Sequence, residues 1–569
     1  MTKTDIHPYV LSGVIAYIGN KRKLLPLIDQ ALADITGGSA GGLRFADLFS
    51  GSGVVARFAR YKGMLVSAND WEPYAGVLGK AWLEPDERKI KEISAKSGFA
   101  DGMDGIFKTM NSLEDPPEHE RYLSKYYSAL SNDRNKTDFR KERLFYTREN
   151  ALKLDAARNY IDKLTDRVKH VLSSEELSLF KAYLLAPVIY EAATHVNTSG
   201  VFKAYHHGFG GYGRDALNRI TSGVYFEIPL IINRVPGKMY TSDALELVKS
   251  GAVSGSDIVY LDPPYNQHQY GSNYHLLNTI VMWDRIPEPL ELGEDGSLKR
   301  KAAIRKDWVK TRSDYCYASS AENAFSGLLE NLDAENLIIS YSTDGIIPIN
   351  RLIDISQKYG RVRLIANPYI TYRGGRQSSS RKNKNLEFLL VVEKGRAASR
   401  TDRKAISRVL KERKLHLLSS MYLDPASAAD FGVITDSQWI VQLPDYGNFT
   451  ITLKCLISVE PLSGIDQLSG SSLDFLIEVF EKSVIENKEE EIKIICSLWE
   501  SGRLDCPEII KRLPVLLRKL AYKKYSEQFI QSLEKIRKAG ASKPASFKKI
   551  ETGINKIEQI YKKRTGKTF

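Results

Sequence analysis

The stretch Arg44-Phe-Ala-Asp-Leu-Phe-Ser-Gly-Ser-Gly-Val-Val-Ala56 decides the fold class of this 569-residue chain. Its apolar beginning, residues 44–49, predicts a buried strand, and the turn Gly51-Ser-Gly53 leads into a predicted helix at residues 54–61. The next apolar segment, residues 64–68, predicts a second strand. This order of strand, glycine turn, helix and strand is typical of the start of an α/β fold.

Segments far downstream complete the predicted sheet. Residues 257–261 and 336–340 predict two parallel strands, and residues 362–365 with 386–392 predict a closing antiparallel pair. The sequence therefore predicts one doubly wound sheet that is assembled from two distant parts of the chain.

The length of the chain predicts two or three folding units. We expect an α/β core of residues 1–84 and 237–398. Residues 85–236 are rich in Lys, Arg and Tyr with helical periodicity, so we expect them to form an inserted helical subdomain. After Gly395 the composition shifts, and residues 399–569 predict a separate, mainly helical C-terminal domain to which the sequence assigns no role.

The composition predicts a globular protein with an acidic partner. Hydrophobic residues make up 43% of the chain and charged residues 27%, and no apolar run approaches the roughly 20 residues of a membrane span. The formal net charge of +13 favours nucleic acid as the partner. We expect a cytoplasmic location, because the apolar residues 10–18 have the wrong flanks for a secretion signal. The four cysteines contain no Cys-x-x-Cys pair, so we expect reduced thiols.

The glycine turn and Asp70 predict a cofactor site. The turn presents backbone N–H groups and a helix N-terminus to a ligand. Asp70 follows the second predicted strand, where a carboxylate can accept hydrogen bonds from both hydroxyls of a ribose. Residues 51–56 also fit the pattern G-x-G-x-x-A, so these residues by themselves are compatible with NAD and with S-adenosylmethionine.

The segment Asp262-Pro-Pro-Tyr265 directly follows the predicted strand at residues 257–261. Its two prolines remove backbone donors and stiffen the turn, which leaves the Asp262 carboxylate and the Pro263 carbonyl as acceptors. Such acceptors suit a planar amine like that of adenine, because accepting its two hydrogens lets the nitrogen pyramidalise toward a methyl sulfonium. The Tyr265 ring is suited to stack on the face of the base.

Taken together, these motifs resemble the Dam-like class of adenine-specific DNA methyltransferases, the DPPY motif family. Tyr17-Ile-Gly-Asn-Lys21 is similar to the N-terminal cofactor motif of that class, Asn69-Asp70 to its ribose motif, and Ser242-Asp243-Ala244 to the motif before its catalytic strand. The resemblance covers about residues 12–395. It implies a Rossmann-like core that transfers a methyl group from S-adenosylmethionine to a flipped-out adenine at a specific site in double-stranded DNA.

The resemblance also implies the residues of the site. The catalytic residues would be Asp262, Pro263, Pro264 and Tyr265. The residues that bind S-adenosylmethionine would be Tyr17, Lys21, Asp47, Phe49, Gly51, Gly53, Asp70, Asp243 and Asp262.

Basic and aromatic residues in two segments are expected to contact DNA, in the insertion and in a loop between two late strands. The predicted DNA contacts are Tyr126, Arg143, Arg148, Arg373, Arg376 and Arg381. We predict no metal site, because methyl transfer needs none and the neighbouring His206 and His207 have no evident third ligand. A cognate restriction endonuclease is an expected partner of an enzyme of this family.

Three alternatives are compatible with the sequence. The same chemistry could act on the amine of cytosine in DNA or on adenine in RNA, although Asp262 before Pro-Pro-Tyr favours adenine. The chain could be a DNA-binding protein on a non-catalytic methyltransferase scaffold, although Lys21, Asp70, Asp262 and Tyr265 form a chemically complete set. A fused nuclease around Asp445 is the weakest alternative, because Glu-x-Lys triplets arise by chance in a Lys-rich chain.

Overall fold

The computed structural model describes residues 6–99, 101–211, 214–366, 387–397, 399–504 and 506–566. The chain divides into two compact units. The first contains the residues up to Ile365 together with Glu387–Asp402, and Arg403 begins the main part of the second.

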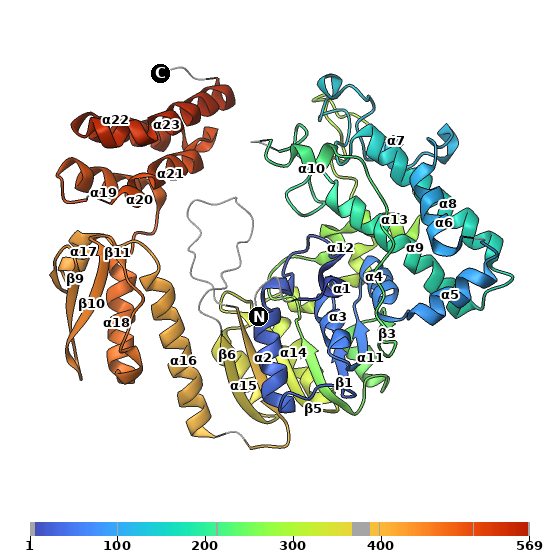
Figure 1. Ribbon diagram of the computed structural model, residues 1–569, viewed down its shortest axis with the longest axis horizontal. Helices are drawn as coiled ribbons and strands as arrows, with labels where there is room; N and C mark the ends of the chain where they lie inside the picture. The colour runs from blue at the N-terminus through green and yellow to red at the C-terminus, as the bar shows by residue number, and fades with distance from the viewer. Residues whose placement is uncertain are drawn as a thin grey trace. The chain divides into compact units, whose positions relative to one another are not determined.

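The first unit is built on a seven-stranded sheet with the strand order β3-β2-β1-β4-β5-β7-β6 (Figure 1). Strands β3, β2, β1, β4 and β5 run parallel, and β7 is antiparallel to β5. The predicted doubly wound fold is thereby confirmed. The strands are β1 Arg44–Asp47, β2 Leu65–Asn69, β3 Lys238–Tyr240, β4 Ser256–Leu261, β5 Ala334–Ser342, β6 Arg361–Ala366 and β7 Glu387–Glu393.

Helices connect the parallel strands on both faces of this sheet. Right-handed crossovers from β1 outward to β3 and from β4 outward to β5 place their helices on opposite faces. Helix α3 contacts β1 and β2, and α11 packs against α14. The helices around the sheet are α1 Pro8–Leu11, α2 Leu25–Thr36, α3 Val54–Tyr61, α4 Pro73–Leu83, α11 Ala244–Lys249, α12 Tyr270–Asn273, α13 His275–Met282, α14 Ala321–Asn331 and α15 Ile349–Ser356.

Two glycines let α4 lie close to β3. A Cβ atom added at Gly79 would collide with the side chain of Met239, and one added at Gly76 would collide with Thr241. The short strand β3, which the sequence analysis did not predict, is therefore held against a helix that sits almost 160 residues earlier in the chain.

The helices of the insertion lie together on one side of the first unit (Figure 1). They are α5 Glu87–Lys96, α6 Gly102–Ser112, α7 Leu123–Tyr126, α8 Arg148–Val168, α9 Ser174–Thr194 and α10 Leu217–Thr221. Helix α9 packs against α4, α8 and α13, so the insertion is joined to the core through a helix interface. Asp155 of α8 is buried and accepts hydrogen bonds from the backbone N–H groups of Tyr122, Leu123 and Ser124, which fixes the start of α7.

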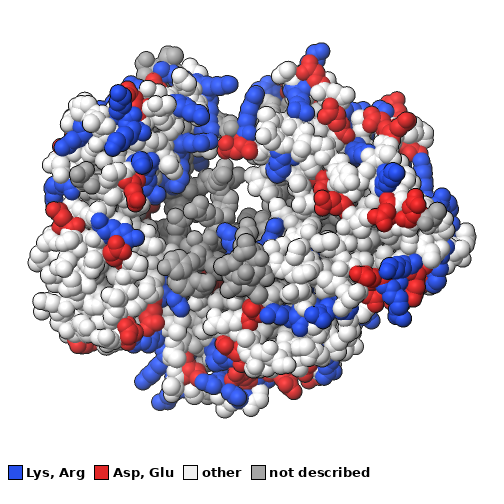
Figure 2. Space-filling view, in the orientation of Figure 1, with Lys and Arg blue, Asp and Glu red and all other residues white. Residues whose placement is uncertain are grey.

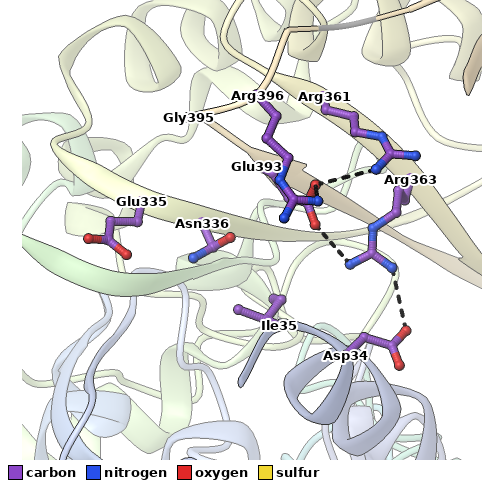
Figure 3. Close-up of a pocket in the computed structure, with 9 residues that line it drawn as sticks. All are labelled: Asp34, Ile35, Glu335, Asn336, Arg361, Arg363, Glu393, Gly395 and Arg396. Carbon is purple, nitrogen blue, oxygen red and sulfur yellow. Dashed lines mark hydrogen bonds and ion pairs between the residues drawn. The ribbon is translucent and has the colours of Figure 1, made fainter. Parts of the chain in front are cut away.

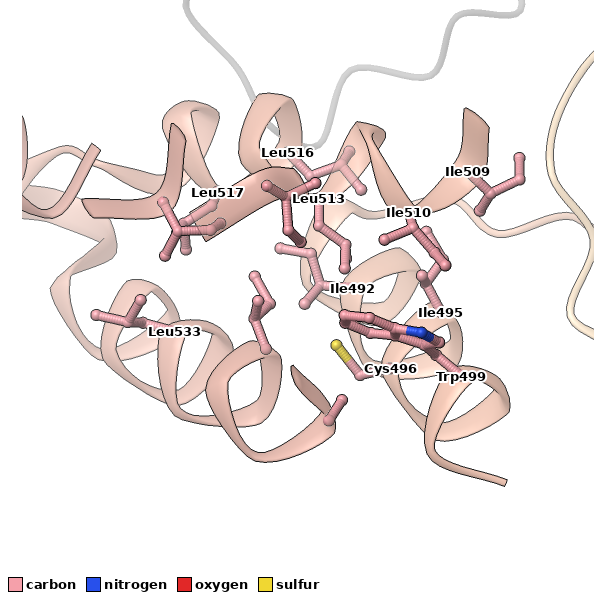
Figure 4. Close-up of a cluster of buried hydrophobic side chains, with 14 of the residues drawn as sticks. Ile492, Ile495, Cys496, Trp499, Ile509, Ile510, Leu513, Leu516, Leu517 and Leu533 are labelled. Atoms are coloured by element: carbon pink, nitrogen blue, oxygen red, sulfur yellow. The ribbon is translucent and has the colours of Figure 1, made fainter. Parts of the chain in front are cut away.

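The second unit combines a small sheet with a bundle of helices. Its four-stranded sheet, of order β11-β10-β9-β8, is antiparallel and was not predicted from the sequence. Buried Ile, Leu and Trp side chains form a separate core among α19 to α23 (Figure 4). The elements are α16 Arg400–Ser419, α17 Pro425–Ala429, β8 Gly432–Ile434, β9 Gln438–Leu443, β10 Gly447–Cys455, β11 Ser458–Val459, α18 Gly470–Ser483, α19 Lys488–Glu500, α20 Pro507–Ile510, α21 Arg512–Leu520, α22 Ser526–Ser542 and α23 Pro544–Thr565.

Within the described ranges, none of the helices is both long and apolar enough to cross a membrane.

Candidate active site

The carboxyl ends of the parallel strands surround one cavity of about 220 Å³. Strands β1 and β4 are neighbours in the sheet, although about 200 residues separate them in the sequence. From this pair the strand order runs outward in both directions, and such a switch point is where open α/β sheets bind their ligands. The predicted residues that line the cavity are Tyr17, Lys21, Phe49, Asp70, Asp243, Asp262, Pro263, Pro264 and Tyr265.

Asp262 and Lys21 form an ion pair inside the cavity. Nζ of Lys21 lies 2.9 Å from Oδ1 of Asp262, and it donates a hydrogen bond to the carbonyl oxygen of Gly19. Only 4% of the Lys21 side chain is exposed. Burial raises the pKa of Asp262 to about 6, and the charge of Lys21 acts in the opposite direction. The ion pair therefore holds a carboxylate oxygen of Asp262, a hydrogen-bond acceptor, where little solvent reaches it.

The ring of Tyr265 is fixed by contacts from three sides. Its hydroxyl donates a hydrogen bond of 3.3 Å to Oε1 of Glu387, at the start of β7. Tyr341 packs against it edge to face, with ring centroids 5.6 Å apart, and Nζ of Lys21 lies 5.3 Å from the ring centroid. Burial raises the pKa of Glu387. Sequence reasoning missed Glu387, because it is 122 residues from Tyr265 and belongs to no recognisable motif.

Tyrosines of α12 and its C-terminal end hold the N-terminal motif in place. The ring of Tyr17 stacks on those of Tyr270 and Tyr274, with centroids 5.2 and 4.9 Å apart. The hydroxyl of Tyr274 accepts a hydrogen bond from the backbone N–H of Ile18. Gly51 has φ +50°, and a Cβ there would meet the Tyr17 ring at 2.8 Å, so this turn requires glycine to let the aromatic ring approach.

Two carboxylates lie side by side on the wall of the cavity after β2. Asp70 accepts hydrogen bonds from the backbone N–H groups of Gly51 and Glu72. Glu72 accepts a hydrogen bond of 2.7 Å from the amide of Asn278, and burial raises its pKa to about 7. Glu72 was not predicted, although it stands only two residues after Asp70. Both side chains are suited to accept hydrogen bonds from hydroxyl groups.

The remaining predicted cofactor residues differ in their positions. Asp243 lines the cavity and also caps α11 by accepting hydrogen bonds from the backbone N–H groups of Leu245 and Glu246. Phe49 lines the cavity and packs edge to face on Tyr315. The predicted residues outside the lining are Asp47, Gly51 and Gly53. Asp47 is buried at the end of β1, where burial and the neighbouring Asp262 raise its pKa well above the usual value.

The acidic and aromatic side chains that line this cavity fit S-adenosylmethionine. Several acidic side chains face the cavity, among them Asp70, Glu72 and Asp262, which suits a ligand with a positive sulfonium, an amino group and ribose hydroxyls. Aromatic side chains supply the apolar surface that an adenine ring needs.

One predicted DNA contact, Arg143, is wrong. This side chain is fully buried, and its guanidinium donates hydrogen bonds to the backbone carbonyls of Tyr126, Glu288, Pro289 and Arg300. It therefore ties the insertion to the segment after α13 and has no surface for a phosphate.

The other predicted DNA contacts have mixed outcomes. Tyr126 and Arg148 are half-buried, and the Arg148 guanidinium donates a hydrogen bond to the Ser124 carbonyl, so their roles stay predictions. Arg373, Arg376 and Arg381 lie outside the described residues.

A larger second cavity, of about 820 Å³, lies at the opposite edge of the sheet (Figure 3). Glu335 and Arg361 come from the first residues of β5 and β6, so this cavity is at the amino ends of the parallel strands. Its charges pair with one another: Arg363 contacts both Asp34 and Glu393 (Figure 3). These mutual ion pairs indicate a structural network rather than a ligand site.

Comparison with known proteins agrees with the geometry of the site. Residues 17–291 match the family described as D12 class N6 adenine-specific DNA methyltransferase. The chain is 28% identical over 381 residues to the Type II methyltransferase M.NlaIII of Neisseria lactamica, covering 66% of this chain and 99% of that protein. It is 30% identical over 391 residues to the Type II methyltransferase M.FokI of Planomicrobium okeanokoites, covering 66% of this chain but only 52% of that protein. The resemblance predicted from the motifs is confirmed, since residues 17–291 are similar to the D12 class of N6 adenine-specific DNA methyltransferases.

Proposed function

We propose that this enzyme transfers a methyl group from S-adenosylmethionine to the exocyclic amine of an adenine that has left the duplex. One observation carries the proposal: the turn Asp262–Tyr265 opens, at the carboxyl end of β4, into the same cavity as the predicted cofactor residues. The two reactants would therefore meet at one place in the sheet, as an in-line transfer requires.

The cavity divides into a cofactor side and a base side. When bound, S-adenosylmethionine supplies a methyl group made electrophilic by the sulfonium. Asp70 and Glu72 would accept hydrogen bonds from the ribose hydroxyls, Asp243 would lie near the adenine of the cofactor, and Phe49 would line its methionine side. The acidic wall also favours a cation electrostatically over a neutral ligand.

Asp262 and Tyr265 would act on the base. The Asp262 carboxylate and the Pro263 carbonyl would accept the two hydrogens of the amine, which frees its lone pair for the methyl carbon. Asp262 would accept the amine hydrogen that the base loses on methylation and pass it to solvent, and S-adenosylmethionine would supply the methyl carbon from a sulfonium that leaves as a neutral thioether. Lys21 favours the ionised form of Asp262, and Tyr265 would stack on the ring of the base.

Double-stranded DNA is the proposed substrate, and the insertion is proposed to recognise it. Lys125, Arg140 and Lys141 are exposed around the connection from α7 to α8, close in sequence to the buried Arg143. These three side chains, rather than Arg143, have the accessibility that phosphate contacts need. A cognate restriction endonuclease that cuts the same sequence is the proposed partner, since the relatives bear the names of Type II and modification methylases.

The test is long-read sequencing of DNA from a methylation-free host that expresses the wild type, Asp262→Ala or a matched control, Asp436→Asn. Asp436 is exposed in the second unit, far in sequence from the cavity residues. We expect methyladenine in one sequence context with the wild type and the control, and none with Asp262→Ala. Methylcytosine would contradict the proposed base. Soluble wild-type protein that binds the cofactor but leaves DNA unmodified would contradict the proposed substrate.

A further inference from the structure

The exposed side of α23, in the second unit, carries a regular row of lysines. Lys549, Lys556 and Lys563 are exposed and stand seven residues apart, so they lie along one face of the helix. The row spans roughly 21 Å at a rise of 1.5 Å per residue. From residue 543 to the end, the chain has eight Lys or Arg and two Glu. We propose that this face of α23 binds the phosphate backbone of duplex DNA.

The acidic residues of α23 lie away from the row. At 100° per residue, Glu551 and Glu558 both project from the opposite half of the helix, and Glu558 pairs with Arg537 of α22 and with Lys562. The side chains that flank the lysines on the outer face are Thr552, Asn555 and Gln559. Hydroxyl and amide groups among lysines are the kind of side chain that contacts phosphates and sugars. The face is therefore positive along its whole length and has polar donors between its charges.

The inner side of the same helix is not available for insertion into a membrane. A basic amphipathic helix binds anionic lipid by inserting its apolar face. In α23 that face consists of Ile550, Ile554, Ile557 and Tyr561, which are 0 to 6% exposed because they belong to the core of the helical bundle. The ring of Tyr561 stacks on Phe529 of α22, with centroids 4.1 Å apart. With its apolar face already buried, the helix offers only its charged face to a partner.

Duplex DNA fits such a face because one negative charge occurs about every 1.7 Å along its axis. Lys and Arg side chains gather over this helical part of the second unit (Figure 2). The inference rests on the proposed function, which makes DNA the substrate. Lysines along one helix read no base sequence, so the face would raise affinity for every duplex alike and leave the choice of site to the first unit.

The experiment uses the full chain with Lys549, Lys556 and Lys563 all changed to Gln. The control carries the same loss of charge elsewhere, with the exposed Lys358, Lys404 and Lys493 changed to Gln. Affinity for a duplex with the target site and for one without it is measured by fluorescence anisotropy at several salt concentrations. Circular dichroism melting checks that both variants are folded.

We expect the α23 variant to lose affinity for both duplexes, on the order of tenfold, and its log-log salt slope to fall by about 2.7, which is 0.9 for each of three phosphates. The control is expected to keep the wild-type slope. Wild-type affinity and slope in the α23 variant would overturn the inference. Lost binding to phosphatidylserine vesicles with unchanged DNA binding would also overturn it. Neither measurement depends on methyl transfer, so failure of the proposed function would be seen separately, as absence of methyladenine with intact DNA binding.

Discussion

Among single residues, Asp262 predicts how the reaction rate depends on pH, because burial shifts the pKa of its carboxyl group. Its pKa is raised to about 6 by burial, so the group is protonated below that pH and ionised above it. Because both oxygens accept hydrogen bonds only in the ionised form, we expect kcat/KM to rise as the pH increases through about 6 and then to level off.

Two variants test this assignment. Asp262→Asn should abolish the fall of kcat/KM at low pH, because the amide does not titrate. It should also lower kcat by about 10² to 10³, since one acceptor becomes a donor. Lys21→Gln should move the midpoint of the rise in kcat/KM to higher pH, because it removes the cation that lowers the pKa of Asp262. A midpoint that stays in place without Lys21 would contradict the role of the ion pair. Initial rates from pH 5 to 9 are the measurement.

Glu387 is a second residue whose effect can be predicted, through the ring of Tyr265. Glu387→Ala removes the carboxylate oxygen that accepts a hydrogen bond from the Tyr265 hydroxyl, so we expect the ring to loosen and kcat to fall by about five- to tenfold, the value of one hydrogen bond. Glu387→Gln keeps an acceptor oxygen and should restore most of the rate.

The readout for Glu387 is 2-aminopurine placed at the target position of the duplex. Its fluorescence is quenched by stacking and should increase in Glu387→Ala. In a double-mutant cycle, Glu387→Ala should add little to Tyr265→Phe, which already lacks the hydroxyl. Fully additive effects would show that the two residues act independently.

At the scale of elements, the packing of α4 on β3 positions the residues that follow β3. A Cβ at Gly79 would collide with Met239, so Gly79→Ala should destabilise the first unit by about 1–3 kcal/mol through overpacking. Asp243 follows β3 by three residues, so we also expect weaker cofactor binding.

A second glycine inside a helix provides the matched control for Gly79. Gly327 of α14 has no atom within 4 Å of an added Cβ, and Gly327→Ala should stabilise the protein by roughly 0.5–1 kcal/mol through helix propensity. Urea unfolding measures both changes. Equal effects of the two substitutions would contradict the packing argument.

At the scale of the whole molecule, the two units have separate cores. The buried cluster that contains Leu516 consists of residues 456–561 alone. We therefore expect two transitions in calorimetry. S-adenosylhomocysteine at 100 times its Kd should stabilise the first unit by about 2.7 kcal/mol and raise only one transition, by a few degrees.

A core substitution in the second unit assigns the other transition. Leu516→Ala removes a fully buried side chain of the helical bundle (Figure 4) and should cost about 2–5 kcal/mol in that unit. If the ligand and Leu516→Ala moved the same transition, the units would unfold together and the prediction of independent cores would be wrong.

Local patterns in the sequence were enough to predict the first helix after the glycine turn and six strands of the sheet. The helix predicted at residues 54–61 has those bounds in the structure, and the predicted strands agree with β1, β2, β4, β5, β6 and β7 to within two residues. Short apolar runs ended by glycine or proline specify such elements, because their signals lie within a few residues of one another. The tetrapeptide at residues 262–265 is recognisable for the same reason. The DNA-recognition role of the insertion stays a prediction.

Which charges are buried and which side chains meet depends on tertiary contacts. Arg143 is of the residue type that contacts DNA phosphates, but its guanidinium donates hydrogen bonds to backbone carbonyls of a segment about 145 residues away. Glu387 reaches Tyr265, and β3 pairs with β2, only after the sheet has brought distant parts of the chain together. A sequence records the chemical identity of each side chain, whereas burial and partners depend on contacts that no local pattern encodes.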